Sequence, residues 1–431
     1  MKKWKRLLCG VIVGMLSAQA TVGAAADLDA KYTIETNEIP SWPQAADIMA
    51  DTGVLMESAT GAILFDKGAN EIRYPASITK LMTLLVAAEN GNLEDKVTFT
   101  ETGIRDVKPD SGNIGMQLGE VLTLEQCLYA MILYSANEVS AQIAEFVGGT
   151  EEAFIEMMNE KAEELGCKNT HFTNASGLPD PNQYTTARDM AQIFRAGLRN
   201  KVFRKVVKTR TFKIPKTNKN DQERFLATHH PLLSEQSGIF DPDCIGGKSG
   251  MTNDAGHTLV TGMKKDGMTL IAVVLRDVDI NQAGVDSQNL FRYGYENFQK
   301  VEVDGGSVVV PKGTDVKTLS VRENQVGENK VRQRYFLNDR YVGRGTIERA
   351  QPTAEPTKTP DTEKEEGDGN AAEPARSEEV KEQEEEQERG LSKTAKILLV
   401  IMGVMALILV ILCNMLIIKK QKKNRRHRRK R

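Results

Sequence analysis

One serine and one lysine stand three residues apart in Tyr74-Pro75-Ala76-Ser77-Ile78-Thr79-Lys80-Leu81-Met82-Thr83. Pro75 favours the entrance of a helix, Asn90-Gly91 favours its end, and apolar residues recur between them at helical spacing. The pattern predicts a helix that carries Ser77 and Lys80 on the same face. A lysine whose amine is kept neutral by burial or by a nearby cation can take the proton of a serine hydroxyl. We therefore interpret Ser77 as a candidate nucleophile and Lys80 as its base.

A second motif, Ser-x-Asn, occurs three times, and its position in the predicted fold separates the copies. Ser111-Gly112-Asn113 lies in a turn, and Ser287-Gln288-Asn289 lies in the last predicted helix. Ser135-Ala136-Asn137 follows a helix that Thr123 can cap, at a junction between two helices, where side chains can project into a cleft. We favour Ser135 and Asn137 as the functional pair.

A third motif, Lys248-Ser249-Gly250, occurs once, within a predicted strand. In a strand, Lys248 and Gly250 share one face, and Ser249 points to the other. A glycine at this place allows a substrate backbone to approach closely. A single lysine in a strand is usually a solvated charge, but as the third motif in this order Lys248 is a candidate anchor for a carboxylate.

The periodicity of the remaining chain indicates an α/β (α+β) protein. A hairpin is predicted between 53 and 66, and short helices cluster between 123 and 166, which suggests a helical subdomain beside a sheet. Lys265-Asp266-Gly267 reads as a hairpin turn. The other predicted elements are strands at 97–100, 211–214, 245–252, 258–263 and 268–276, short strand-like runs such as 307–310 and 340–343, and helices over 150–166, from 185 and over 282–298.

Segments outside this central part differ strongly in charge, although the net charge of the 431 residues is only −2. Residues 1–26 have the basic, apolar and small-residue regions of an export signal, cleaved after Ala26 or Ala20, or retained as an anchor. Residues 351–392 form an acidic tether, with fourteen acidic and five basic residues between 351 and 390. Residues 301–350 are expected to be a small β-rich segment.

The C-terminal residues predict one transmembrane helix. Residues 397–418, within the segment 393–418, are 22 residues with Asn414 as the only strongly polar one, which is long enough for one span. Residues 419–431 contain ten basic side chains in thirteen and are expected to stay in the cytoplasm. Next to a span, such a tail is a topology anchor rather than a nucleic-acid site. The catalytic part would then lie outside the cytoplasm, on a single-pass protein of the cell membrane.

The cysteine and histidine content argues against a disulfide framework and a metal centre. Only Cys127, Cys167 and Cys244 lie outside the predicted signal and span, and this odd number favours burial as small apolar residues. The five histidines have no spacing typical of metal ligands, and no cofactor is implied.

The three motifs in this order resemble those of the penicillin-recognising serine acyltransferases. More specifically, the resemblance is to the low-molecular-mass D-alanyl-D-alanine carboxypeptidases, and it covers roughly residues 48–298. It implies a β-lactamase/transpeptidase-like antiparallel sheet flanked by helices, within a domain over residues 27–300. The stretches that carry it are Pro75 to Thr83, Asn174 to Asp180 with Thr185-Thr186-Ala187-Arg188-Asp189, and Gly246 to Gly250 with Thr252 and Ala255-Gly256.

The resemblance also implies a mechanism on peptidoglycan stem peptides, which β-lactams would block. Ser77 would attack the carbonyl between two terminal D-alanines, Lys80 would act as general base, and water would hydrolyse the acyl-enzyme. Ser135 would relay the proton to the leaving amine. The substrate would be bound by Asn137, Lys248, Ser249, Gly250, Met251 and Thr252, with the backbone amides of Ser77 and Met251 forming the oxyanion hole.

Several departures from the family pattern keep alternatives open. Ser249 replaces the usual threonine, and His229-His230-Pro231 stands where relatives often have asparagine. The predicted span would replace an amphipathic anchor. A peptidoglycan endopeptidase and a β-lactamase would use the same residues, although no acidic residue is evident as a deacylating base. A non-enzymatic penicillin-binding scaffold or receptor is the third alternative, and thirteen cytoplasmic residues leave no room for a signalling domain.

Overall fold

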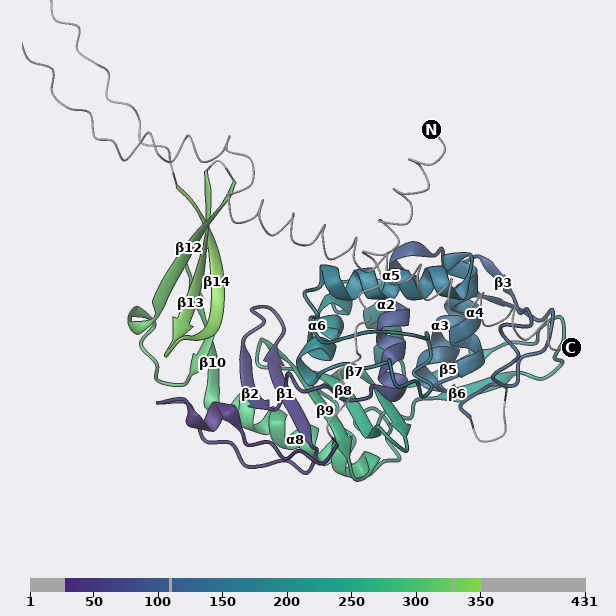
Figure 1. Cartoon of the computed structure of the whole chain (residues 1–431), viewed down its shortest axis with the longest axis horizontal. Coiled ribbons are helices and arrows are strands. Elements are labelled where there is room, and N and C mark those ends of the chain that lie inside the picture. Colours follow the sequence, from purple (N-terminus) through teal and green to yellow (C-terminus); the bar gives the residue numbers. More distant parts are fainter. Residues whose placement is uncertain (1–27, 108–110, 328, 350–431) are drawn as a thin grey trace, which may run out of the picture. The chain divides into compact units, whose positions relative to one another are not determined.

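The structure is a computed structural model that describes residues 28–107, 111–327 and 329–349. Its central element is an antiparallel sheet in the order β2-β1-β9-β8-β7 (Figure 1). In this sheet β1, from the start of the domain, pairs with β9, from near its end. Leu55 pairs with Ala272, for example, in the β1–β9 register. The strands are β1 (Thr52–Glu57), β2 (Ile63–Lys67), β7 (Cys244–Thr252), β8 (Gly256–Lys265) and β9 (Met268–Asp277).

The turns of this sheet follow the local sequence. Asp266 and Gly267 both have positive φ, of 50° and 77°, and Lys265 pairs with Met268, as a two-residue hairpin turn requires. Gly61, at φ 80°, lies in the turn between β1 and β2. The two hairpins predicted at these positions are therefore confirmed.

Helices cover both faces of the sheet. Alternate residues of β1 point into two different cores on opposite faces of the sheet. Val54 and Met56 belong to the core that contains α2, and Leu55 belongs to the core that contains α8. Helix α2 lies among α3, α4, α5 and α6, and its residues from Lys80 to Ala87 are all buried (Figure 1). The helices are α2 (Lys80–Asn90), α3 (Leu124–Leu133), α4 (Asn137–Gly148), α5 (Glu151–Glu164), α6 (Ala187–Gly197), α7 (Lys201–Lys208) and α8 (Ile280–Asn297).

Side-chain caps set where these helices begin. Thr123 accepts a hydrogen bond from the backbone of Gln126, whose side chain accepts one from Thr123, so α3 starts with a complete capping box. Thr150 and Thr186 cap α5 and α6, because the side chain of each threonine accepts a hydrogen bond from the backbone three residues later. The predicted starts near these threonines are confirmed, whereas α7 was not predicted.

Short elements complete the domain around the helices. Helix α2 is preceded by the 3₁₀ turn η2. A further hairpin, β5–β6, includes the strand β6, which the sequence pattern did not indicate. Cys127, Cys167 and Cys244 are buried and unpaired, as expected from their number. The short elements are η1 (Glu35–Glu38), η2 (Ala76–Thr79), β3 (Lys96–Thr98), β4 (Val121–Thr123), β5 (Thr211–Ile214) and β6 (Arg224–Ala227).

The residues after α8 form a second five-stranded sheet, in the order β10-β11-β14-β13-β12. The sequence predicted two short strand-like runs here and missed β10, β12 and β13. The eight residues of β12 are all exposed, so this strand has no apolar alternation that a pattern could reveal. The elements are β10 (Phe298–Val303), β11 (Gly306–Pro311), η3 (Val316–Thr318), β12 (Ser320–Gly327), β13 (Lys330–Leu337) and β14 (Arg340–Glu348).

Polar contacts join this second sheet to β2. The Asp66 carboxylate is fully buried, and its Oδ2 accepts hydrogen bonds from Arg188 at 3.0 Å and from Arg340 at 3.1 Å. The Tyr341 hydroxyl donates to the carbonyl of Thr60 at 3.1 Å. One carboxylate thus bridges two arginines, one from α6 and one from β14.

The terminal segments named above lie outside the described residues. These are the export signal (1–26), the tether (351–392), the transmembrane segment (393–418) and the basic tail (419–431). Within residues 28–107, 111–327 and 329–349, no helix is both long enough and apolar enough to cross a bilayer.

Replacing Asp66 by asparagine tests the junction between the two sheets. The Asp66→Asn variant leaves two arginines without their shared carboxylate, so its free energy of unfolding should fall by about 3 kcal/mol. Urea unfolding measures this change. Glu235→Gln is the control, because its exposed pair with Arg210 at 2.6 Å should contribute less than about 1 kcal/mol. Equal losses in both variants would contradict the assigned role of Asp66.

Candidate active site

Ser77 lies in a strained turn at the entrance of α2. The preceding residue, Ala76, has φ of 49°, a left-handed conformation that costs a non-glycine residue about 1 to 3 kcal/mol. The Thr258 hydroxyl on β8 donates a hydrogen bond to the carbonyl of Pro75 at 3.0 Å and helps to hold this turn. Sheet and helix together therefore fix the backbone of Ser77.

Two glycines let neighbouring segments approach the turn. A Cβ added to Gly177 would lie 1.9 Å from the carbonyl oxygen of Ala76, so no larger residue fits there. A Cβ added to Gly250 on β7 would lie 2.7 Å from the backbone nitrogen of Ser77. The third motif thus lies directly beside the serine of the first motif.

The Lys80 amine is fully buried and reaches three acceptors from three segments. Its Nζ lies 3.1 Å from Ser77 Oγ, 2.7 Å from Asn137 Oδ1 and 2.5 Å from the carbonyl oxygen of Ser176. Burial, followed by the charge of Lys248, holds the pKa of Lys80 well below its usual value. The first two motifs are therefore brought together, with a lysine whose neutral form is favoured.

Ser111, which the sequence pattern left in a turn, lies against the second motif. Asn137 Nδ2 donates to Ser111 Oγ at 2.7 Å, and the backbone nitrogen of Asn137 donates to the carbonyl of Gly112 at 2.8 Å. These contacts fix the amide of Asn137 so that its oxygen faces Lys80. The interpretation of Ser111 as a plain turn residue was incomplete, because the turn packs on the junction between α3 and α4.

Ser135 occupies that junction and is half-exposed. Its φ of 58° is left-handed, and its carbonyl lies against Gly112, where an added Cβ would be 2.7 Å from the oxygen. The backbone strain is typical of functional turns, in which the surrounding structure determines the conformation.

The Lys248 side chain is buried, 3% exposed, on β7. Its Nζ donates to the carbonyl of Ser249 at 2.7 Å, and burial lowers the pKa of Lys248 to about 7. Gly250 is buried on the same face, whereas Ser249 is half-exposed, as the strand pattern predicted. Farther along β7, Met251 is 59% exposed, and Thr252 accepts from the backbone of Ala255 at 3.1 Å.

Glu138 is a buried acid that the sequence reasoning missed. Its Oε1 accepts a hydrogen bond from the backbone of Ile114 at 2.7 Å, which holds the end of the Ser111 turn, and its Oε2 has no partner among the described residues. Burial raises the pKa of Glu138 to about 7. The only signal in the sequence was its position directly after Asn137.

The two histidines that depart from the family pattern lie beside Lys248 and are held neutral. Burial lowers the pKa of His230 to about 4, and its Nε2 lies 3.1 Å from Thr261 Oγ1. Burial, followed by the charge of Lys248, lowers the pKa of His229, whose ring centroid is 5.3 Å from that of Tyr134. The pair connects β8 to the end of α3 without adding positive charge at neutral pH.

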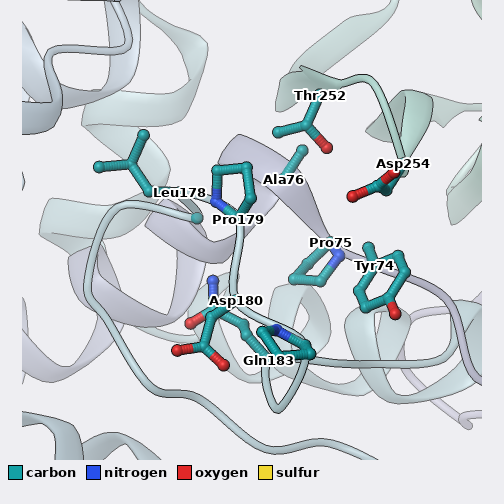
Figure 2. Close-up of a pocket in the computed structure, with 11 residues that line it drawn as sticks. Tyr74, Pro75, Ala76, Leu178, Pro179, Asp180, Gln183, Thr252 and Asp254 are labelled. Atoms are coloured by element: carbon teal, nitrogen blue, oxygen red, sulfur yellow. The ribbon is translucent and has the colours of Figure 1, made fainter. Parts of the chain in front are cut away.

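A small pocket opens beside the Ser77 turn, as Figure 2 shows. It has a volume of about 150 Å³. Pro75 and Ala76 form one wall, and Asp180 and Asp254 contribute carboxylates at other parts of the lining. In the part of the chain that the structure describes, no group of three histidine, cysteine, aspartate or glutamate side chains could hold a metal ion.

The comparisons with known proteins agree with this geometry. The family profile described as D-alanyl-D-alanine carboxypeptidase matches residues 39–279. The chain is 33% identical over 275 residues to D-alanyl-D-alanine carboxypeptidase DacF of Bacillus subtilis, covering 63% of this chain and 66% of the relative. It is 34% identical over 277 residues to D-alanyl-D-alanine carboxypeptidase DacA of Haemophilus influenzae, covering 62% and 67%. The chain thus spans about two thirds of the length of these relatives.

Solved structures that resemble this chain indicate the same family. Penicillin-binding protein 5 of Haemophilus influenzae superposes with a TM-score of 0.61 at 26% identity, covering 71% of this chain and 98% of that one. The DD-transpeptidase of Streptomyces K15 superposes with a TM-score of 0.55 at 29% identity, covering 59% and 100%. The chain therefore belongs to the D-alanyl-D-alanine carboxypeptidase family of serine peptidases, the low-molecular-mass penicillin-binding proteins.

Proposed function

We propose that this chain is a serine-type D-Ala-D-Ala carboxypeptidase, which removes the terminal D-alanine of peptidoglycan stem peptides through an acyl-enzyme on Ser77. The observation that carries the proposal is the buried amine of Lys80, 3.1 Å from Ser77 Oγ, with a pKa held well below its usual value. A neutral amine at that distance accepts the serine proton as the oxygen attacks the peptide carbonyl. β-Lactams would acylate the same oxygen.

The other motifs supply substrate binding and charge stabilisation. Protonated Lys248 would bind the terminal carboxylate of the substrate, and Ser249 would donate a hydrogen bond to it. The closeness of Gly250 to the Ser77 nitrogen supports an oxyanion hole made by the backbone amides of Ser77 and Met251. Each such donor contributes about 10² to 10³ in rate.

The leaving amine needs a proton, and the second motif lies where it could provide one. The Ser135 hydroxyl would pass the proton from Lys80 to the leaving D-alanine, while Asn137 would hold both Lys80 and the substrate backbone. The pocket in Figure 2 lies beside Ala76 and ends at Thr252 on β7, which suits a peptide that runs along this strand.

A β-lactamase function is less well supported by the surroundings of Ser77. Rapid release of a β-lactam acyl group requires a base that activates water. Glu138 and Asp106 are the two buried carboxylates whose charges act on Lys80. Glu138, the one with the larger effect, is fully buried, and its Oε1 accepts a hydrogen bond from the backbone of Ile114. The relatives cited above are named carboxypeptidases, which also favours the main proposal over an endopeptidase or a scaffold.

The location of the protein is part of the proposal and rests on sequence alone. Residues 1–26 would direct export, residues 393–418 would form one membrane span, and residues 419–431 would remain in the cytoplasm. The catalytic domain would then face its substrate outside the cell membrane. Fractionation of cells with a salt wash would leave such a protein in the membrane pellet.

Removal of the nucleophile tests the central step. The Ser77→Ala variant should release D-alanine from a D-Ala-D-Ala peptide at least about 10⁴-fold more slowly than the parent chain, because no acyl-enzyme forms. Mass spectrometry after incubation with a β-lactam should show the acyl adduct in the parent chain alone. Ser234→Ala, at a half-exposed serine whose hydroxyl donates to Gln236 Oε1 at 3.1 Å, is the matched control and should retain both activities. Release that persists in Ser77→Ala would overturn the assignment.

The pH dependence tests the carboxylate anchor. Lys248, with a pKa of about 7, is protonated below that pH and neutral above it. If it binds the substrate carboxylate, kcat/KM should fall on the alkaline side. Lys248→Arg keeps its charge at all accessible pH values, so this alkaline limb should disappear even if the rate is lower. Lys265→Arg, at an exposed turn, serves as control. An unchanged alkaline limb in Lys248→Arg would refute this role.

Replacing Ser111 tests whether it positions Asn137. Ser111→Ala removes the acceptor for Asn137 Nδ2, so kcat/KM should fall about 10-fold. The amide oxygen would no longer be fixed against Lys80, so the charged form of Lys80 would be less favoured and the acid limb of the pH profile should move to lower pH. Ser111→Thr, which keeps the hydroxyl, should restore both. A normal acid limb in Ser111→Ala would show that Ser111 acts on folding alone.

A further inference from the structure

The second sheet carries a line of arginines across three adjacent strands. Arg322 on β12 is directly opposite Arg334 on β13, and Arg334 is directly opposite Arg344 on β14. All three side chains are exposed. Like charges directly opposite each other destabilise a sheet, so this arrangement is unfavourable unless an anion lies against it.

Two further cations extend this surface along β13. Arg332 and Lys330 are two and four residues from Arg334, so the strand presents all three on the same face. We call Arg322, Lys330, Arg332, Arg334 and Arg344 the arginine face. Arg322 pairs with Asp339 at 2.9 Å. Over the described ranges, Lys330, Arg332, Arg334 and Arg344 make no ion pair.

Aromatic rings hold two of these guanidinium groups in place. The Arg322 guanidinium carbon lies 4.3 Å from the ring centroid of Phe336, and that of Arg334 lies 5.2 Å from the centroid of Tyr341. A guanidinium group held over a ring keeps its N–H edges available for carboxylates or phosphates and loses little entropy on binding them. The face is therefore built for an anionic partner.

The positive field also reaches the catalytic domain. Burial, followed by the charges of Arg199 and Arg344, lowers the pKa of Arg195 on α6. The face itself has five cations, of which Arg322 has the ion pair with Asp339, so a partner with several negative charges fits it better than an isolated carboxylate.

We propose that the arginine face binds the acidic part of this same chain, residues 361–388. That segment contains thirteen acidic and three basic residues. Its glutamates and aspartates match the arginines in charge and in the bidentate geometry that guanidinium groups favour.

Chain connectivity favours this occupant over an external one. β14 ends at Glu348, which is opposite Lys330 on the arginine face. The residues between Glu348 and Asp361 can extend about 40 Å, whereas the face from Lys330 to Arg334 spans about 13 Å. A segment tethered by a short flexible linker has an effective concentration of about 1 mM, which favours it over a free partner present at a lower concentration.

A zero-length carbodiimide cross-link tests the contact in the full chain, kept in detergent. The reagent joins a lysine amine to a carboxylate that touches it, and Lys330 is the lysine of the arginine face. Peptide mass spectrometry should find Lys330 joined to acidic residues of 361–388 at low salt and several-fold less at high salt. A Lys330–Glu348 product, within the sheet, is the internal reference for the reactivity of the amine.

Substitution of the arginines makes the test specific. In Arg332→Gln/Arg334→Gln/Arg344→Gln the cross-link to 361–388 should fall about tenfold relative to the Lys330–Glu348 product. The matched control, Lys216→Gln/Lys219→Gln/Lys265→Gln, removes three exposed charges elsewhere and should keep it. Thermal unfolding of each variant checks its fold, and the salt dependence in the parent chain is an independent measurement that requires no variant.

Three results would overturn the proposal. The first is the absence of the cross-link at low salt while the Lys330–Glu348 product forms. The second is a cross-link between isotopically heavy and light chains in a mixture, which would assign the face to the acidic segment of a second copy. The third is loss of the cross-link with equimolar inorganic polyphosphate, which would assign the face to an external polyanion.

Discussion

The burial of the Lys80 amine is the constraint on which the arrangement of the domain depends. Removing an ammonium group from water costs several kcal/mol, so a buried lysine persists only where fixed acceptors surround it. Here the acceptors come from the Ser77 turn, from Asn137 on α4 and from the carbonyl of Ser176. Each acceptor belongs to a different segment, so the correct packing of α2 and its neighbours is also the condition for an active lysine.

Lys248 is the second buried lysine of the site, and its charge influences the protonation of Lys80. Burial lowers the pKa of both lysines, that of Lys248 to about 7, and the charge of Lys248 lowers the pKa of Lys80 further. A substrate carboxylate beside Lys248 would favour its charged form, and that charge would further favour the neutral form of Lys80. Binding of the correct substrate would therefore prepare the base, whereas a peptide without a terminal carboxylate would not. Glu138 acts in the opposite direction on Lys80, and its own raised pKa limits that effect.

The sequence predicted the parts of this structure that local chemistry determines. Thr123 and Thr150 cap helices, and Asp266-Gly267 adopts the positive φ angles of a tight hairpin. It did not predict the contact of Ser111 with Asn137, because that contact joins a turn to a helix 26 residues away and depends on packing. The strand β12 was missed for a different reason, since all of its residues are exposed and it has no apolar period.

The net charge of −2 is a poor description of the chain, because opposite charges are concentrated in different segments. The cations of the arginine face lie in register on three strands, and the excess of acidic residues follows about a dozen residues after the last of those strands. Either charge cluster alone would be unfavourable, the first by cross-strand repulsion and the second by repulsion along the chain. Each cluster reduces the repulsion within the other only if the two are in contact. In the arginine line only Arg322 has an ion pair, with Asp339, so the proposed contact with the acidic segment would relieve the repulsion that remains among the other cations.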